Sequence, residues 1–184
     1  MKKLLIVVDF QKDFVDGALP YPEAAGFLPR VDELIDTYER CDNDVIFTRD
    51  EHSKDYLHTE EGRNLPVPHC LEGSEGWAFC GDLEERAKKH LVFTKDTFGS
   101  SKMFDYLEKH SSEYSYIALV GLDLSICVLT NALLAKTACP NAHIVVDLSA
   151  SGSSDAEAAH HAIEALRRVH VEVADFSKGK NGLL

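Results

Sequence analysis

Near its start the chain reads KLLIVVD, residues 3–9, a short uninterrupted run of apolar residues that ends in an aspartate. Runs of this kind are typical of strands that are buried on both faces of a parallel sheet. Five later segments have a similar character: residues 44–50, 90–95, 116–121, 143–148 and 171–175. Together these segments predict a six-stranded sheet.

Helical patterns lie between the apolar runs. In residues 28–40 the apolar side chains recur at spacings of three and four, which indicates an amphipathic helix. Four further helices are expected at residues 81–89, 101–109, 124–137 and 154–169. In the last of them, Ser154 and Glu157 have the spacing of an N-terminal capping box. Strands that alternate with helices predict an α/β fold of three layers, α/β/α, with a mostly parallel sheet.

Length and composition fit one globular domain over residues 1–184, since 45% of the residues are hydrophobic and 27% are charged. The formal net charge of −12 argues against nucleic acid as a partner, because phosphate binding needs clustered lysine and arginine. No apolar stretch is long enough to span a bilayer, and the first residues lack the features of a signal peptide. We therefore expect a cytoplasmic protein without a membrane partner. The five cysteines, an odd number, argue against a disulfide framework.

Residues 51–79 interrupt the alternation of strands and helices. This connection shows little periodicity and contains two prolines and three glycines. Connections of this length are uncommon in compact domains and often carry function. We expect it to form a loop of the active site and of a metal site.

Reactive side chains stand where the expected strands end. Asp9, Asp50 and Lys95 close three of the apolar runs, and Cys127 stands near the start of the helix expected at 124–137. In open α/β sheets, ligands bind outside the carboxyl ends of the strands. We therefore expect these four side chains to share one edge of the sheet.

Cys127 has the surroundings of a nucleophile. A helix N-terminus and an ammonium such as Lys95 both favour a thiolate, and Asp9 could accept the thiol proton. This combination suits acyl transfer through a thioester. Each residue also has an ordinary reading: Cys127 as a buried helical cysteine, Asp9 as a turn residue and Lys95 as an ion-pair partner of Asp96. Their common position at one sheet edge favours function over these readings.

A second group of residues can bind a metal. Alternate residues of an extended chain point the same way, so Asp50 and His52 can contact one ion, and His69 can return to it through the long connection. Two imidazoles and a carboxylate suit a divalent ion, and we expect Zn²⁺, with Fe²⁺ or Mn²⁺ as alternatives. Spacing leaves a fourth ligand open among three residues: His58, Glu60 and Glu61. The competing interpretation is a solvated acidic loop with incidental histidines.

With these residues identified, the sequence resembles the isochorismatase-like cysteine hydrolases, and among them the nicotinamidase-type amidases. Five stretches carry the resemblance, in the order and spacing of the family: VVDFQKDF (7–14), TRDEH (48–52), PVPHCLEGSEGWAF (66–79), FTKDTFGS (93–100) and GLDLSICVLTNAL (121–133). They are spread over nearly the whole chain. The resemblance implies an isochorismatase-like fold with a Rossmann-type strand order.

The family pattern also implies catalytic roles. It makes Cys127 the nucleophile, Asp9 the general base and acid, and Lys95 the cation beside both. It implies a cis peptide bond between Leu122 and Asp123. The backbone N–H groups of Asp123 and Cys127 are then implied to form an oxyanion hole.

The resemblance further implies how a substrate is held. A metal bound by Asp50, His52 and His69 is implied to contact the pyridine nitrogen of nicotinamide. The implied pocket contains three apolar side chains: Phe14, Leu65 and Phe98. For the two phenylalanines, ordinary core packing is an equally good interpretation.

The reaction implied by the resemblance is hydrolysis of nicotinamide to nicotinate and ammonia, a step of NAD salvage. The alternative within the family is a cysteine hydrolase for another small amide or a ureido compound. A different class is a non-catalytic binding protein that kept the fold. Family members often assemble, so we expect a homo-oligomer.

The chain departs from the nicotinamidase pattern just before the cysteine. Leu124, Ser125 and Ile126 stand where a Thr-Asp pair and one further residue are usual. The change removes the carboxylate of that pair from the start of the helix, and we expect any unusual substrate preference to originate here.

Overall fold

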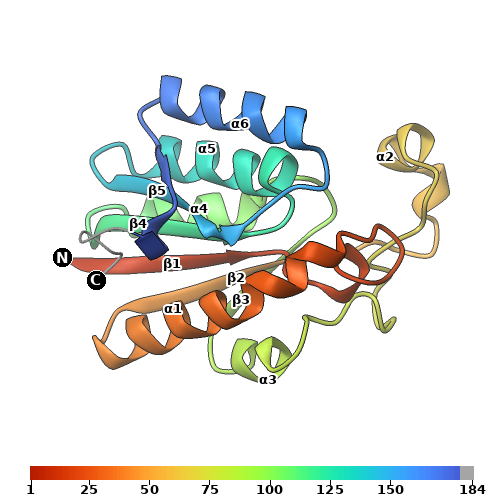
Figure 1. Cartoon of the computed structure of the whole chain (residues 1–184), viewed down its shortest axis with the longest axis horizontal. Helices are drawn as coiled ribbons and strands as arrows, with labels where there is room; N and C mark the ends of the chain where they lie inside the picture. The colour runs from red at the N-terminus through yellow and green to blue at the C-terminus, as the bar shows by residue number, and fades with distance from the viewer. Residues whose placement is uncertain (179–184) are drawn as a thin grey trace.

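The computed structural model describes residues 1–178, and a six-stranded sheet forms its centre (Figure 1). In chain order the strands are β1 (Lys2–Val8), β2 (Asp44–Asp50), β3 (Leu91–Lys95), β4 (Tyr114–Gly121), β5 (His143–Ser151) and β6 (Glu172–Ala174). They lie in the order β3-β2-β1-β4-β5-β6, and every neighbouring pair is parallel. The predicted α/β fold is confirmed, with a sheet that is wholly rather than mostly parallel. The last six positions of the domain expected over 1–184 lie outside the described residues.

Helices cover both faces of this sheet (Figure 1). One face carries α1 (Leu28–Arg40) and α3 (Leu83–Ala87), and the other carries α4 (Ser101–Lys109), α5 (Leu129–Ala138) and α6 (Ala156–Arg168). The central strand β1 contributes to both hydrophobic cores, because Leu4 and Ile6 pack with α4 to α6 whereas Leu5 and Val7 pack with α1 and α3. Burial on both faces requires an apolar side chain at every position, which explains the uninterrupted apolar run in the sequence.

The helix ends differ from the prediction in two places. α6 is capped by Asp155, whose Oδ1 accepts hydrogen bonds from the N–H groups of Glu157 (3.0 Å) and Ala158 (2.9 Å). The predicted cap at Ser154 is wrong by one residue, because the aspartate that follows it caps a helix equally well. The helix expected at 81–89 is reduced to α3. Among the described residues, no helix has the length and apolarity needed to cross a membrane.

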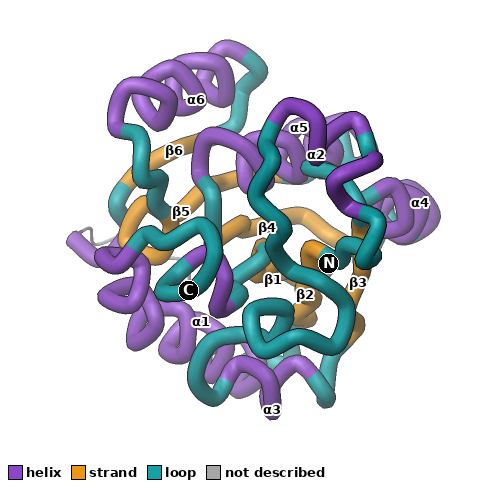
Figure 2. The backbone as a smooth tube through the Cα atoms, turned by 90° about the vertical axis from the view of Figure 1, so that its right-hand side faces the viewer, coloured by secondary structure: helices purple, strands orange, loops and turns teal. Residues whose placement is uncertain are grey.

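The connection at 51–79 contains more regular structure than its sequence indicated. It includes a 3-10 turn, Tyr56–His58, and the short helix α2, Glu60–Asn64. The connection then returns beside its own start, since the His52 N–H donates to the Cys70 carbonyl (3.0 Å) and the Glu72 N–H donates to the His52 carbonyl (2.9 Å). Figure 2 shows that this connection lies with other loops at the carboxyl ends of the strands.

Candidate active site

Adjacent strand ends form the floor of the candidate active site. β1 lies between β2 and β4, so Asp9, which follows β1, sits between the ends of those two strands. Lys95, the last residue of β3, is in register with Asp50, the last residue of β2. Because all the strands run in one direction, these ends meet at the same edge of the sheet.

Lys95 is the centre of a buried ion network at this edge. Its Nζ lies 2.7 Å from Asp9 Oδ2, 3.0 Å from Asp50 Oδ1 and 3.6 Å from Cys127 Sγ. The hydroxyl of Thr48 donates a hydrogen bond of 2.7 Å to the other oxygen of Asp9. All five side chains are buried. The structure therefore brings together the three residues that the sequence resemblance assigned to catalysis.

Burial determines the resting protonation of this network. It raises the pKa of Cys127 well above that of a free thiol, and the ammonium of Lys95 only partly offsets this effect. Burial also raises the pKa of Asp9, against the lowering effect of Lys95. Burial lowers the pKa of Lys95, but the charges of Asp9, Cys127 and Asp50 outweigh it and raise that pKa well above the usual value. Burial therefore favours the neutral thiol of Cys127 at rest, against the nearby charge of Lys95, which favours the thiolate.

Cys127 is carried by a tight turn after β4. Gly121 has a φ of 130°, and a Cβ at this position would lie 2.0 Å from the carbonyl oxygen of Val8, so only glycine fits. The peptide bond Leu122–Asp123 is cis, as the resemblance implied. The expected helix begins as a π-helical turn, Leu124–Val128, and continues as α5. π-helical turns are rare in proteins overall, and many of those that occur lie at functional sites.

Asp123 shapes this turn with its backbone and its side chain. Its carbonyl oxygen accepts hydrogen bonds from the N–H groups of Ile126 (3.2 Å) and Val128 (3.0 Å), the two neighbours of Cys127. The N–H of Cys127 is not one of the two N–H groups that donate to this carbonyl oxygen. The Oδ1 of Asp123 accepts from the N–H (2.7 Å) and the hydroxyl (2.6 Å) of Ser125. The carboxylate of the usual Thr-Asp pair is absent, and Asp123 supplies a carboxylate as the cap of this turn.

Asp50, His52 and His69 converge on one point, as their spacing predicted. Asp50 Oδ2 lies 3.0 Å from His52 Nε2 and 3.3 Å from His69 Nε2. Donor atoms that each lie about 2.1 Å from one ion are about 3–3.5 Å apart, so these separations fit a shared divalent ion.

The tautomer of His69 also points to a cation. Its Nδ1 lies 2.8 Å from the carbonyl oxygen of Val67, which can only accept, so Nδ1 carries the proton. In the neutral ring, Nε2 then presents a lone pair to the carboxylate of Asp50, and two such groups face each other favourably only with a cation between them. A proton on Nε2 can take the place of such a cation: burial lowers the pKa of His69, but the hydrogen bonds to Asp50 and Val67 outweigh it and raise the pKa, so Asp50 favours positive charge at this point. The donor set therefore fits a divalent metal.

Asp50, His52 and His69 together form what we call the metal-type cluster. Asp50 links this cluster to the ion network of Lys95. Its Oδ1 contacts Lys95 and its Oδ2 faces both histidines. Burial raises the pKa of Asp50, but the hydrogen bonds to His52 and His69 and the charge of Lys95 outweigh it and hold that pKa well below its usual range. Asp50 is therefore an ionised carboxylate shared by the two halves of the site.

Glu61 is the one of the three expected alternatives that the structure places beside the metal-type cluster. Its Oε1 lies 3.7 Å from His52 Nε2 and 3.6 Å from His69 Nε2. Glu60 is exposed and accepts hydrogen bonds from Arg63 and Asn64, which belong to the same helix. His58 is exposed as well. The orientation of α2 thus determines which of the two adjacent glutamates faces the histidines.

Two supporting residues were not identified from the sequence. Gln11 holds the backbone of Asp50, since its Nε2 donates to the Asp50 carbonyl (2.8 Å) and its Oε1 accepts from the Asp50 N–H (2.7 Å). Asp13 is buried and accepts hydrogen bonds from the N–H groups of Cys70 (2.7 Å) and Ala18 (2.9 Å). Both lie in VVDFQKDF, where polar side chains directly after a buried strand were the available signal.

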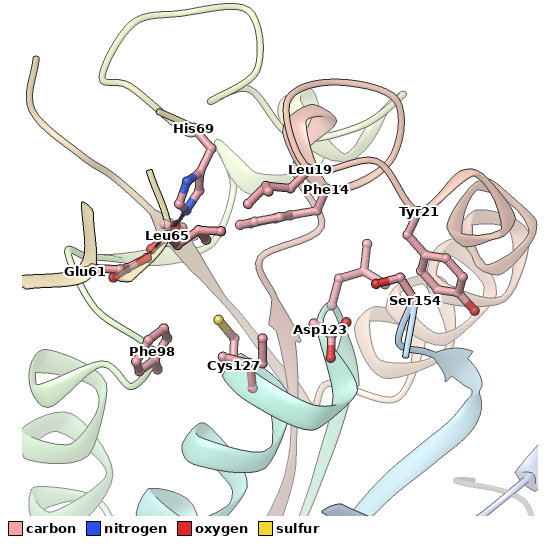
Figure 3. Close-up of a pocket in the computed structure, with 13 residues that line it drawn as sticks. Phe14, Leu19, Tyr21, Glu61, Leu65, His69, Phe98, Asp123, Cys127 and Ser154 are labelled. Atoms are coloured by element: carbon pink, nitrogen blue, oxygen red, sulfur yellow. Dashed lines mark ion pairs between the residues drawn. The ribbon is translucent and has the colours of Figure 1, made fainter. Parts of the chain in front are cut away.

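A cavity of about 260 Å³ opens beside Cys127 (Figure 3). All three side chains expected in the pocket line it: Phe14, Leu65 and Phe98. Leu65 and Phe98 are 37% and 45% exposed, so these two are walls of the cavity rather than core residues. The volume lies below the roughly 300–1,000 Å³ of sites for drug-sized ligands, so the cavity suits a smaller molecule. Further lining residues were not expected in the pocket: Leu19, Tyr21, Leu122, Ile126 and Ser154.

Three comparisons with known proteins match the chain over almost its full length. The family model described as Isochorismatase domain matches residues 3–177. Nicotinamidase from Saccharomyces cerevisiae is 25% identical over 217 residues, which cover 94% of this chain and 99% of that protein. Pyrazinamidase of Pyrococcus horikoshii in complex with zinc has a TM-score of 0.81 at 24% identity, over 96% of this chain and 100% of that one. N-carbamoylsarcosine amidase from Thermoplasma acidophilum has a TM-score of 0.77 at 24% identity, over 99% and 100%.

Proposed function

Because the chain belongs to the Isochorismatase domain family and is an amide hydrolase of that family, we propose that it hydrolyses nicotinamide to nicotinate and ammonia. The observation that carries this proposal is the position of Asp50. One carboxylate touches both the ammonium of Lys95 and the two histidines of the metal-type cluster. A single small cavity therefore offers a nucleophile at one place and a binding point for a ring nitrogen a short distance away.

Cys127 and Asp9 carry out the proton and acyl transfers in this proposal. The sulfur of Cys127 forms a bond to the carboxamide carbon while its proton passes to Asp9. Breakage of the C–N bond then yields a thioester, and Asp9 returns the proton to the departing nitrogen, which leaves as ammonia. A water molecule gives a proton to Asp9 as its oxygen attacks the thioester carbon. Nicotinate leaves, and the thiol of Cys127 recovers its proton.

The protonation states of the buried network suit this sequence of steps. The neutral thiol needs a base at the moment of attack, and burial makes Asp9 a stronger base than an exposed aspartate because it raises the pKa. The ammonium of Lys95, 3.6 Å from Cys127 Sγ, stabilises negative charge as it develops on sulfur. Lys95 therefore acts by charge and does not transfer a proton.

Backbone groups of the turn complete the machinery. We assign the N–H groups of Asp123 and Cys127 to the oxyanion of the tetrahedral intermediate, because Cys127 is the nucleophile, Asp123 stands in the turn before it and both residues line the cavity. Phe14, Leu65 and Phe98 provide the apolar walls for a flat ring and exclude water from it.

The metal-type cluster has the composition of a Zn²⁺ site, with Fe²⁺ or Mn²⁺ as alternatives. Asp50, His52 and His69 are the ligands, and Glu61 is placed to reach the ion directly or through water. When bound, the metal supplies a Lewis-acid binding point for a ring nitrogen of the substrate. The pyrazinamidase with zinc is a structural neighbour that supports this assignment.

The alternative substrate is another small amide or a ureido compound, and the N-carbamoylsarcosine amidase likeness supports it. A histidine-carboxylate cluster at the cavity favours a substrate with a metal-binding nitrogen, so nicotinamide remains the leading proposal. We further propose that residues 1–184 form one domain and that the protein assembles as a homo-oligomer. We also propose that it acts in NAD salvage in the cytoplasm.

Ammonia release tests the proposal. Purified protein with zinc is incubated with nicotinamide and with pyrazinamide, before and after treatment with a chelator. We expect ammonia from nicotinamide, a loss of activity with the chelator, and no turnover by Cys127→Ala. No ammonia from either amide in the presence of metal would refute the substrate, and undiminished release by Cys127→Ala would refute the mechanism.

A further inference from the structure

The cavity beside Cys127 has a second polar end. At one end lie Glu61 and His69 of the metal-type cluster. Figure 3 shows Tyr21, Asp123 and Ser154 on the opposite side of Cys127 from these two residues. The proposed mechanism uses only the backbone N–H of Asp123, so the side chains at this end have no role in it.

Only one of the two side-chain oxygens of Asp123 accepts hydrogen bonds within the described residues. Both hydrogen bonds to its side chain, from the N–H and the hydroxyl of Ser125, end on Oδ1. Within residues 1–178, no ion pair and no hydrogen bond involves Oδ2. The residue is partly buried and lines the cavity. An unpartnered carboxylate oxygen on a residue that lines a small cavity can act as a strong acceptor for a ligand group.

The charges around the cavity define which ligand group this oxygen favours. Three carboxylates line the cavity, those of Asp50, Glu61 and Asp123, and none of the described lining residues is a lysine or an arginine. The nearby ammonium of Lys95 is held by Asp9 and Asp50. A bound divalent ion and Lys95 offset the charges of Asp50 and Glu61, whereas within residues 1–178 no cationic side chain forms an ion pair with Asp123. The end of the cavity at Asp123 therefore favours a cation or an N–H donor on the ligand and disfavours a carboxylate there.

The hydroxyl groups of Tyr21 and Ser154 extend the same polar end. Burial raises the pKa of Tyr21, and the charges of Glu23 and Asp123 raise it further. Its phenol group therefore stays protonated at neutral pH. Both hydroxyl groups can accept a hydrogen bond from an amino group whose other hydrogens reach Asp123.

We propose that Asp123 determines substrate specificity by binding an amino or similar N–H donor group on a small carboxamide, at the end of the cavity away from the metal-type cluster. The substrate class is then an amino-substituted aromatic carboxamide, and amides that would place a carboxylate at this end of the cavity are disfavoured. This inference rests on the proposed function, because it assumes that the cavity holds a carboxamide next to Cys127.

A purely structural role for Asp123, as the cap of the π-helical turn, must be separated from this one. Asparagine retains an acceptor oxygen for the N–H of Ser125 and is an equally good cap. It removes the charge and presents an N–H₂ group in place of the second oxygen. Asp123→Asn is therefore the test variant, and Asp105→Asn, at an exposed position of α4, is the control with the same change of net charge.

The experiment compares nicotinamide with two positional series, aminomethyl-nicotinamides and carboxy-nicotinamides substituted at ring positions 2, 4, 5 and 6. Ammonia release gives kcat/KM for each compound with the zinc-loaded enzyme. For at least one position we expect the aminomethyl compound to be preferred about tenfold or more over both nicotinamide and its carboxy counterpart. Asp123→Asn reduces this preference about tenfold, whereas Asp105→Asn retains it. The ratio between substrates is the readout, because any effect of Asp123 on the chemical step is common to both.

A binding experiment separates failure of this inference from failure of the proposed function. The same compounds are titrated by calorimetry into zinc-loaded Cys127→Ala, with and without Asp123→Asn, so that no turnover is needed. Tighter binding of an aminomethyl compound that is lost in the double variant supports the inference even if no amide is hydrolysed. If nicotinamide is hydrolysed but no aminomethyl compound is preferred in either assay, or if Asp123→Asn retains the preference, the inference is refuted and the nicotinamidase proposal stands.

Discussion

Replacement of Lys95 by methionine isolates the charge that holds the buried network together. The Lys95 ammonium is almost fully buried and lies 2.7 Å from Asp9 and 3.0 Å from Asp50. Methionine has a similar length and no charge, so packing is retained while two carboxylates lose their shared counterion. At an effective dielectric constant of about 20, each lost attraction amounts to about 6 kcal/mol, so both carboxylates cannot stay ionised side by side.

The free-energy cost of protonating Asp9 determines how much stability the Lys95→Met variant loses. Burial already raises its pKa against the lowering effect of Lys95, so Asp9 is the group that takes up a proton in the variant. At pH 7, protonation of a carboxyl whose unfolded pKa is about 3.9 costs about 4 kcal/mol, at 1.36 kcal/mol per pH unit. At pH 5 the same step costs about 1.5 kcal/mol. A carboxyl with a raised folded pKa binds a proton on folding, so the loss of stability grows as pH rises.

Urea unfolding followed by circular dichroism measures this prediction at pH 7 and pH 5, with the metal content kept constant. We expect Lys95→Met to lower the free energy of unfolding by about 4 kcal/mol at pH 7, or about 8–16 °C in Tm, and by about 1.5 kcal/mol at pH 5. Lys89→Met, at an exposed position, is the control and should change neither value. A loss below about 1 kcal/mol at pH 7, or an equal loss at both pH values, would contradict the account of the network.

Three further changes test other parts of the site. Asp13→Ala leaves two backbone N–H groups without their acceptor and should destabilise the protein by about 2–4 kcal/mol in urea unfolding; an unchanged midpoint would show that solvent replaces the carboxylate. Gly121→Ala puts a Cβ 2.0 Å from the Val8 carbonyl oxygen and should cost more than about 3 kcal/mol, with loss of soluble protein as the first sign; a stable variant would contradict the close approach of β1 and β4. His69→Gln should weaken zinc binding at least about tenfold in a chelator competition, and unchanged affinity would exclude His69 as a ligand.

Sequence alone determined the elements and the chemistry of the candidate groups. The apolar runs gave six strands at nearly their observed positions, because a strand buried on both faces needs an apolar residue at each position. The aspartate, lysine and histidine residues at the ends of those runs were visible for the same reason, since each interrupts an apolar pattern at a strand terminus. The family resemblance then assigned Cys127 its role as nucleophile and implied the cis peptide bond, which no local pattern indicates.

Only the tertiary structure decided which of these groups meet and in which protonation state. The choice of Glu61 over Glu60 depends on how α2 packs after the long connection, and adjacent residues in a sequence do not reveal this. Burial favours the neutral thiol of Cys127 and outweighs the nearby lysine, and the extent of burial is not visible in the sequence. Asp123 lines the cavity because the turn after β4 brings this residue to it, and its carboxylate caps the same turn. Side-chain direction, desolvation and contact across distant segments depend on packing, and packing is a property of the folded chain.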